Sequence, residues 1–240
     1  CSSDLTTLQR EANRIYGMTA KQTLDTAQSL YEKKLITYPR TDSQYLTEDM
    51  EQTARNVVRQ IYEKYQLTGP FDQPEQPDVK KVMNNSKVTD HHAIIPTMEL
   101  ASCHLDELKS WEEKILFLIA VHTVMAMSKN HIYQETEIEV ECQGEIFKAK
   151  GKNVLQDGWK VFENCFKNKD RMAIVDPDQE MKERMPKVTQ GQTFYAVAAE
   201  KTEHFTSPPK PYSEDTLLAA METAGNKEFD EDTEKKGDRK

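Results

Sequence analysis

Residues 36–43 read Ile-Thr-Tyr-Pro-Arg-Thr-Asp-Ser and carry side chains suited to chemistry on a phosphodiester. Tyr38 offers a phenolic oxygen as a nucleophile, and Arg40 offers a guanidinium that can bind phosphate oxygens in a fork and favour the phenolate. Pro39 biases the residue before it toward extended backbone, in which residues two apart point to the same side. We therefore expect Tyr38, Arg40 and Asp42 to share one face.

Two helices should precede and position this octet. Apolar residues at helical spacing predict a first helix over 7–16, which Gly17 ends as a C-cap. Thr19 and Gln22 form a capping box for a second helix, which reaches about Lys34 and leads directly into the octet. The pair is a helix-turn-helix candidate, and an ordinary helical hairpin is the alternative because sequence does not fix the crossing angle.

The rest of the chain changes from helical to strand patterning. Thr47 should cap a third helix that extends to Tyr65, and glutamates that alternate with apolar residues over 135–142 predict a strand with one wet face. Gly144 indicates a turn after that strand. The remaining expected elements are a helix over 105–127, strands at 146–150, 159–162 and 193–200, and a helix at 214–223.

The predicted fold class is α+β with three parts. A helical domain with the helix-turn-helix-like region spans 1–129, an antiparallel β segment spans 130–205, and a short helical tail, the start of a further domain, spans 206–240. At 240 residues, the chain is long enough for two domains and a substantial core.

Composition limits the compartment and the partners. The chain is 30% charged and 37% hydrophobic, and no apolar run approaches the roughly 20 residues of a membrane helix. Its four cysteines are isolated, which indicates neither a zinc site nor a disulfide framework and fits a reducing cytoplasm. The net charge is −9, yet residues 1–70 are balanced, so a local groove for nucleic acid is compatible with the overall acidity.

Three separated motifs resemble one family, the type IA DNA topoisomerases. Residues 5–12, 27–32 and 36–43 resemble its active-site region, and residues 90–97 (Asp-His-His-Ala-Ile-Ile-Pro-Thr) resemble its second signature. The third signature is matched by Gly-Trp at 158–159 and by residues 204–221. The Tyr-Pro-Arg and Pro-Pro-Lys-Pro-Tyr forms look most like the topoisomerase III branch.

This resemblance implies that Tyr38 cleaves one DNA strand, forms a 5′-phosphotyrosine and frees a 3′-hydroxyl. The other strand then passes, giving relaxation of negative supercoils or decatenation, and reversal reseals the break without ATP. The implied partner is DNA, which is single-stranded at the cleavage site, and no membrane partner is implied. The implied location is the cytoplasm, in association with the nucleoid.

The resemblance also implies roles for individual residues. Arg40 would position the scissile phosphate, and His91 would hydrogen-bond the phosphate region or support proton transfer. Residues that match positions near the bound strand or its loop are Gln28, Glu32, Thr41, Asp42 and Ser43. Structural alternatives are an Arg40–Asp42 ion pair, a buried His91–His92 pair, and an exposed helix face for Gln28 and Glu32.

The resemblance implies Mg²⁺ as the family's cofactor, held by an N-terminal toprim domain. No part of this sequence resembles that domain. The acidic triplet Asp176, Asp178 and Glu180 has a metal-binding spacing, but it follows the tyrosine and we interpret it as chance. We therefore expect no metal site here. Because the chain opens at Cys1 without a methionine, we expect a fragment. Because the toprim domain is missing, we expect this fragment to be folded but inactive alone, although it could still bind single-stranded DNA.

Two non-enzymatic interpretations compete. In the first, residues 7–34 are a helix-turn-helix module for duplex DNA and Tyr38 is structural. A duplex-binding helix should carry a basic face, yet residues 19–34 hold three lysines against Asp25 and Glu32. In the second, the acidic chain is an interaction scaffold that does not bind DNA.

Overall fold

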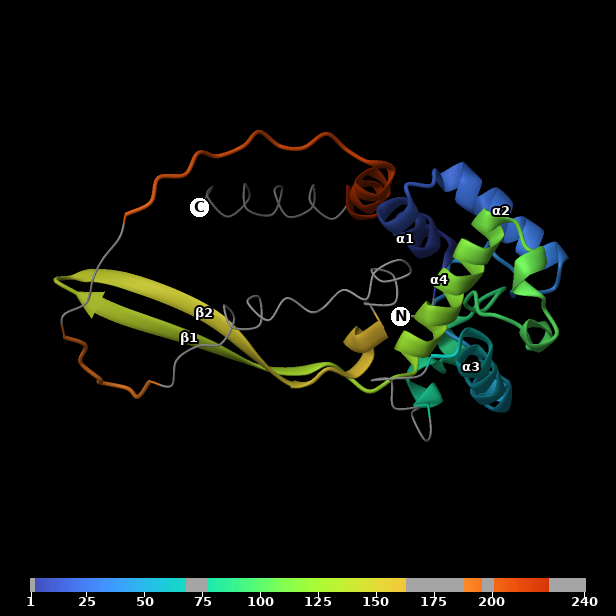
Figure 1. The fold of residues 1–240 in the computed structure, drawn as a ribbon, viewed down its shortest axis with the longest axis horizontal. Helices are drawn as coiled ribbons and strands as arrows, with labels where there is room; N and C mark the ends of the chain where they lie inside the picture. The colour runs from blue at the N-terminus through green and yellow to red at the C-terminus, as the bar shows by residue number, and fades with distance from the viewer. Residues whose placement is uncertain (1–2, 68–76, 163–187, 196–200, 225–240) are drawn as a thin grey trace, which may run out of the picture. The chain divides into compact units, whose positions relative to one another are not determined.

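The computed structural model describes residues 3–67, 77–162, 188–195 and 201–224 (Figure 1). These residues form helices and one two-stranded antiparallel sheet, which confirms the predicted α+β class. The chain divides into two compact units. The first contains the described residues of 1–129, 158–162 and 212–224, and the second contains those of 130–157 and 188–211. The sequence-based boundaries at 129/130 and 205/206 stay a prediction.

The first two helices begin and end where local signals place them. α1 (Leu5–Tyr16) begins at Asp4, whose side chain accepts a hydrogen bond from Thr7 N (2.6 Å), and ends at Gly17 with a left-handed φ of 67°. α2 (Ala20–Glu32) begins with the predicted capping box between Thr19 and Gln22. Both helices are therefore confirmed.

The third helix begins differently from the prediction. α3 (Glu51–Tyr65) follows a 3₁₀ turn at Glu48–Met50, and the Thr47 side chain makes no capping hydrogen bond, so Thr47 was the wrong cap. The backbone N–H of Glu48 instead donates to Asn85 Oδ1 at 2.9 Å. A side chain from a distant loop thus satisfies one of the free amides at the start of this turn.

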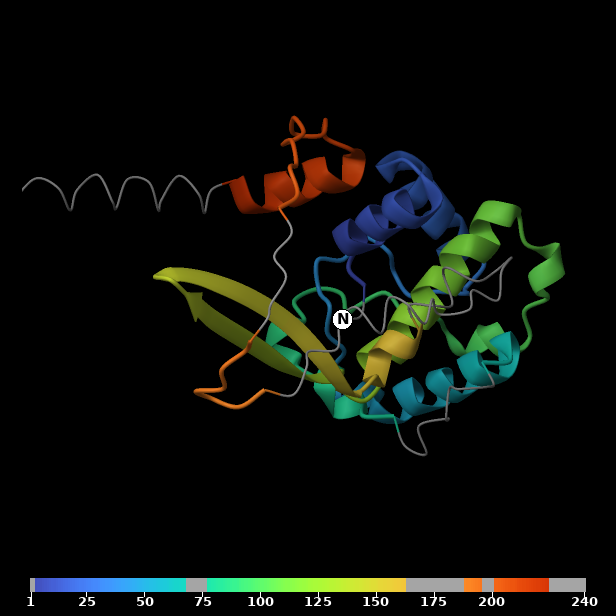
Figure 2. The same cartoon turned by 60° about the vertical axis from the view of Figure 1, so that its left-hand side comes forward.

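The fourth helix forms the centre of the first unit. α4 (Ser110–Ala126) is apolar on nearly all sides, as expected of a helix buried in a core, and packs against α1, α2 and α3 (Figures 1 and 2). The predicted helix over 105–127 is therefore correct in kind, but its first turn is a separate 3₁₀ turn at Leu105–Glu107. No helix within the described residues is long and apolar enough to cross a membrane.

The strand predicted at 159–162 is wrong. Gly158–Phe162 is a 3₁₀ helix whose Trp159 N–H donates to Lys129 O at 3.0 Å. Phe162 is buried and meets Tyr62 edge to face, with ring centroids 6.3 Å apart. The apolar run therefore packs into the helical core instead of pairing in a sheet. Of the strand predicted at 193–200, residues 193–195 are not extended into a sheet, and 196–200 lie outside the described residues.

The second unit contains a long hairpin. β1 (Ile132–Cys142) and β2 (Glu145–Gln156) pair antiparallel through a tight turn at Gln143 and Gly144, both with positive φ. The strand predicted over 135–142 is confirmed, and its glutamates face lysines of β2 across the ladder. These cross-strand ion pairs are Glu135–Lys152, Glu137–Lys150 and Glu139–Lys148. The expectation of a single wet face is wrong, because Val140 and its cross-strand partner Phe147 on the other face are exposed as well.

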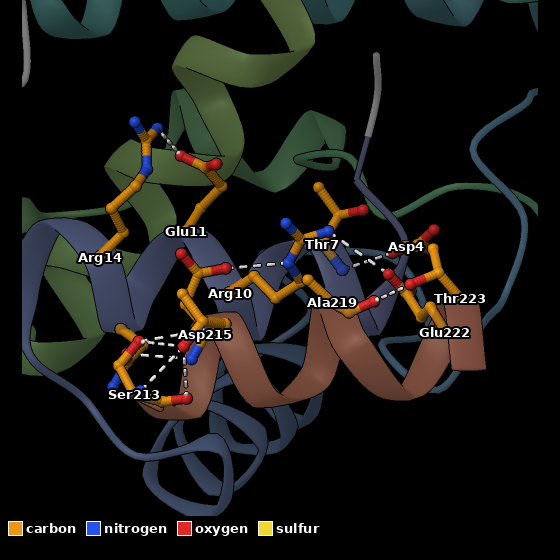
Figure 3. Close-up of polar contacts among 12 residues, drawn as sticks. Asp4, Thr7, Arg10, Glu11, Arg14, Ser213, Asp215, Ala219, Glu222 and Thr223 are labelled. Carbon is orange, nitrogen blue, oxygen red and sulfur yellow. Dashed lines mark hydrogen bonds and ion pairs between the residues drawn. The ribbon is translucent and has the colours of Figure 1, made fainter. Parts of the chain in front are cut away.

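A last helix, residues 214–224, lies along α1 (Figure 3). Arg10 of α1 bonds Asp215 (Nε to Oδ1, 2.9 Å) and Glu222 (Nη1 to Oε2, 3.3 Å). The Asp215 N–H also donates to Asn13 Oδ1 at 3.2 Å. Leu217 on the same helix is exposed, whereas Leu218, Ala219 and Ala220 are partly buried, so apolar and polar contacts both contribute to the docking.

We expect the Arg10→Ala substitution to loosen this helix selectively. Exposed ion pairs are weakened by salt, so 0.5 M NaCl should have a similar effect on the unsubstituted chain. Hydrogen exchange of residues 214–224 should speed up about three- to tenfold, while α3 and α4 keep their protection. Arg14→Ala is the control, because Arg14 pairs with Glu11 inside α1. Equal exchange in both variants would contradict the Arg10 assignment.

Candidate active site

The segment that carries Tyr38 is hydrogen-bonded to a second segment more than fifty residues later. The Thr37 N–H donates to Ile95 O at 3.0 Å, and the Ile95 N–H donates back to Thr37 Oγ1 at 3.0 Å. Two residues further, the Thr97 N–H donates to Leu35 O at 3.0 Å. The first and second signature segments therefore lie side by side with their backbones in register.

Two buried hydroxyls brace the loop after Tyr38. Thr41 Oγ1 donates to His91 O at 2.9 Å and accepts from Ser43 N at 3.1 Å. Ser43 Oγ donates to Lys87 O at 2.8 Å. Both hydroxyls thus hold the loop by hydrogen bonds to backbone groups of the protein. A direct contact of Thr41 or Ser43 with DNA stays a prediction.

Tyr38 is half-buried and meets two other aromatic rings. The His91 ring lies 4.3 Å away between centroids at an angle of 45°, and the Tyr31 ring lies 5.4 Å away, edge to face at 78°. Tyr38 and His91, which the sequence selected from separate motifs, are thus in contact. Tyr31 was not predicted as a site residue, although it lies within the matched residues 27–32 and in the last turn of the helix that leads into the octet.

Burial alternates along the octet after Tyr38. Pro39, Thr41 and Ser43 are buried, whereas Arg40 and Asp42 are exposed. This alternation agrees with the expectation that Arg40 and Asp42 share a face. No ion pair joins them, and within the described residues neither has an ion-pair partner. The guanidinium is therefore accessible to an anion.

The other predicted site residues lie at or near the surface. His91 is exposed, so it does not form the buried pair with His92 that was one alternative. On α2, Gln28 Nε2 donates to Glu32 Oε1 at 3.2 Å along one helix face, and Glu32 is exposed. Their contact with a bound strand stays a prediction.

The end of α2 is tied to α4 by a buried carboxylate. Glu112 is only 3% exposed and accepts hydrogen bonds from Ser29 Oγ (2.7 Å), Lys33 Nζ (2.6 Å) and Lys109 N (3.0 Å). Burial raises the pKa of this carboxyl, but the three hydrogen bonds and the Lys33 charge outweigh it and lower the pKa to about 2. The last turn of α2, just before the Tyr38 loop, is therefore fixed to the core.

Comparisons with known proteins agree on one family. A family model described as DNA topoisomerase matches residues 3–225. The chain is 38% identical to DNA topoisomerase 3 of Bacillus licheniformis over 228 residues, which is 91% of this chain and 29% of that protein. It is also 38% identical to DNA topoisomerase 3 of Bacillus subtilis, covering 91% of this chain and 30% of that protein.

A solved structure shares the fold of this chain. Full-length topoisomerase I from Thermotoga maritima superposes with a TM-score of 0.56 at 23% identity, covering 92% of this chain and 34% of that one. The chain belongs to the type IA DNA topoisomerase family, as its three motifs predicted. It is similar in sequence to proteins named DNA topoisomerase 3, and it spans about a third of their length.

The described residues do not offer a metal site. Among them, no group of three or more His, Cys, Asp or Glu side chains is placed to hold an ion. The acidic triplet at 176–180 lies outside the described residues. The described residues therefore do not fit a Mg²⁺ site.

The Glu112 carboxylate should make stability depend on acid. Its pKa is about 2 in the folded chain against an ordinary 4.5, so the unfolded chain takes up the proton at higher pH. The stabilisation is therefore complete above about pH 5 and lost as pH falls from about 4.5 toward 2. We expect Glu112→Gln to lower the free energy of unfolding by about 2–3 kcal/mol at pH 7.

Urea unfolding at pH 7, 5 and 3 measures this effect as the difference in the free energy of unfolding between the variant and the unsubstituted chain. That difference should shrink with acid, because the protonated carboxyl resembles the amide. Glu107→Gln is the control, since Glu107 is exposed on the turn before α4. If the difference in the free energy of unfolding stays constant with pH, the ionised Glu112 carboxylate does not stabilise the fold as proposed.

Proposed function

We propose that the protein containing this chain cleaves and rejoins one DNA strand through Tyr38. The ring contact between Tyr38 and His91 carries the proposal, because it unites the nucleophile and proton-handling candidates of two separate motifs. Membership of the DNA topoisomerase family supports the same reaction. Its outcomes would be relaxation of negative supercoils and decatenation by strand passage.

The reaction balances without an external energy source. The Tyr38 oxygen attacks phosphorus and gives up its proton, and the bond from phosphorus to the 3′-oxygen breaks. The 3′-oxygen takes up a proton, while the 5′-phosphate remains bonded to Tyr38. The reverse attack by the 3′-hydroxyl restores the DNA, so one phosphodiester is exchanged for another and ATP is not required.

Arg40 and His91 would assist at the phosphate. The exposed guanidinium can bind two phosphate oxygens and stabilise the charge that develops during displacement. His91 is exposed and its ring contacts that of Tyr38, which supports a role in hydrogen-bonding the phosphate or in moving the phenolic proton. Gln28, Glu32 and Asp42 would lie along the bound strand.

The substrate and surroundings follow from the same proposal. A single strand is the proposed substrate at the cleavage site, since α2 lacks the basic face expected of a duplex-binding helix. Mg²⁺ would be held by residues outside those described here, in an N-terminal toprim domain. The proposed location is the cytoplasm, in association with the nucleoid.

A chimera tests the nucleophile. Residues 3–225 replace the matching segment of Bacillus subtilis DNA topoisomerase 3, and the protein is incubated with Mg²⁺ and end-labelled single-stranded DNA. We expect a denaturation-resistant protein–DNA adduct that Tyr38→Phe abolishes, because the phenylalanine ring has no oxygen to attack phosphorus. Tyr45→Phe, a tyrosine on the same loop, should leave the adduct intact.

Two outcomes contradict this proposal. An adduct that persists in Tyr38→Phe assigns the nucleophile elsewhere. A chimera that forms no adduct, with the chain binding duplex in preference to single strands, favours the non-catalytic helix-turn-helix interpretation.

His91→Ala separates catalysis from folding. We expect the adduct to form about 100-fold more slowly, in the range that loss of a positioned proton-transfer or phosphate-binding group produces. The free energy of unfolding should fall by no more than about 1 kcal/mol, because the ring is exposed and loses one aromatic contact. Single-turnover kinetics and urea unfolding measure the two effects. Collapse of the fold would show that His91 is a structural residue instead.

A further inference from the structure

The Tyr31 side chain is exposed and yet contacts the ring of Tyr38, which packing in the core does not explain. It lies in the last turn of α2 with 39% of its surface exposed, yet its ring meets the Tyr38 ring edge to face at 5.4 Å. Its neighbour Leu30 is fully buried and supplies the apolar anchor of that turn. The Tyr31 ring therefore contributes little to the core and makes its aromatic contact at the site.

The backbone of Tyr31 is held rigidly on both sides. Ser29 and Lys33, two residues before and two after it, both bond the buried Glu112 carboxylate of α4. Lys34 N–H donates to Tyr31 O at 2.8 Å and closes the helix end. The ring of Tyr31 thus projects from a fixed point toward a residue on the following loop.

A nucleophilic phenol needs a narrow range of ring orientations. Displacement at phosphorus requires the attacking oxygen in line with the leaving oxygen, within about 3–3.5 Å of phosphorus. An edge-to-face aromatic contact changes the population of one side-chain orientation by about two- to tenfold. A contact of this kind can therefore limit where the Tyr38 oxygen points.

We propose that Tyr31 is a positioning residue, whose ring on the clamped end of α2 holds the Tyr38 ring in the orientation needed for attack. This inference rests on the proposed function, because it assigns Tyr31 a part in the same step. It does not require Tyr31 to contact DNA, and the hydroxyl of Tyr31 is not needed for it.

The kinetic test uses the chimera with Tyr31→Ala and Tyr31→Phe. At saturating oligonucleotide, Tyr31→Ala should slow adduct formation and religation alike by about tenfold, since a positioning contact acts on the shared transition state. The dissociation constant for the uncleavable oligonucleotide complex, measured in the Tyr38→Phe background, should stay within about twofold. Tyr31→Phe, which keeps the ring, should restore both rates.

Tyr133→Ala is the matched control. Tyr133 is 42% exposed and also meets one other aromatic ring, that of His131, but it lies on β1 in the second unit. Its removal should leave both rates unchanged. Unfolding by urea should be nearly the same for Tyr31→Ala and the unsubstituted protein, which separates positioning from loss of fold.

Each other outcome overturns the inference. Weaker oligonucleotide binding with unchanged rates at saturation would make Tyr31 a base-stacking platform. Unchanged rates and binding would leave it a passive surface residue. A rate loss that Tyr31→Phe shares would assign the effect to the hydroxyl.

A second measurement is independent of catalysis. In the 240-residue chain, NMR shifts of the Tyr38 ring protons should move in Tyr31→Ala and stay close to their original values in Tyr31→Phe. Unmoved shifts in Tyr31→Ala would overturn the positioning role even if the reaction is present. Loss of the adduct in Tyr38→Phe tests the proposed function separately, so the two failures are distinguishable.

Discussion

The hydrogen bonds between the Tyr38 segment and residues 93–97 are the constraint on which the site depends. Thr37 exchanges two bonds with Ile95, through its N–H and its hydroxyl, and Thr41 reaches the carbonyl of His91. An irregular segment would leave its backbone groups unpaired in the interior, and this pairing satisfies them. It also fixes the distance between the phenol and the imidazole, because both project from the paired segments.

A second set of bonds fixes the approach to that pairing. The Glu112 carboxylate holds the last turn of α2 through Ser29 and Lys33, and α4 in turn is surrounded by the core. Burying a carboxylate is unfavourable unless it is paired and hydrogen-bonded, and here three donors meet it. The site is therefore supported from two directions, by a charged clamp before Tyr38 and by backbone pairing around it.

Sequence could predict what local signals decide. Gly17 and the Thr19–Gln22 capping box act within one helical turn, so α1 and α2 were placed correctly. Phe162 shows the limit, because its apolar run suits a strand or a core turn and only the tertiary packing with Tyr62 decides. Tyr31 was missed for a related reason: its contact with Tyr38 depends on how the chain turns after α2.

The division between loop-bracing and exposed side chains is compatible with the proposed binding of a phosphodiester by an acidic chain. Thr41 and Ser43 use their hydroxyls to hold the loop, so Arg40 is not needed for that purpose and has no ion-pair partner among the described residues. A guanidinium that is already paired would have to be released before it could bind phosphate. For the proposed reaction, the net charge of −9 therefore matters less than the accessible Arg40 guanidinium on the loop that follows Tyr38.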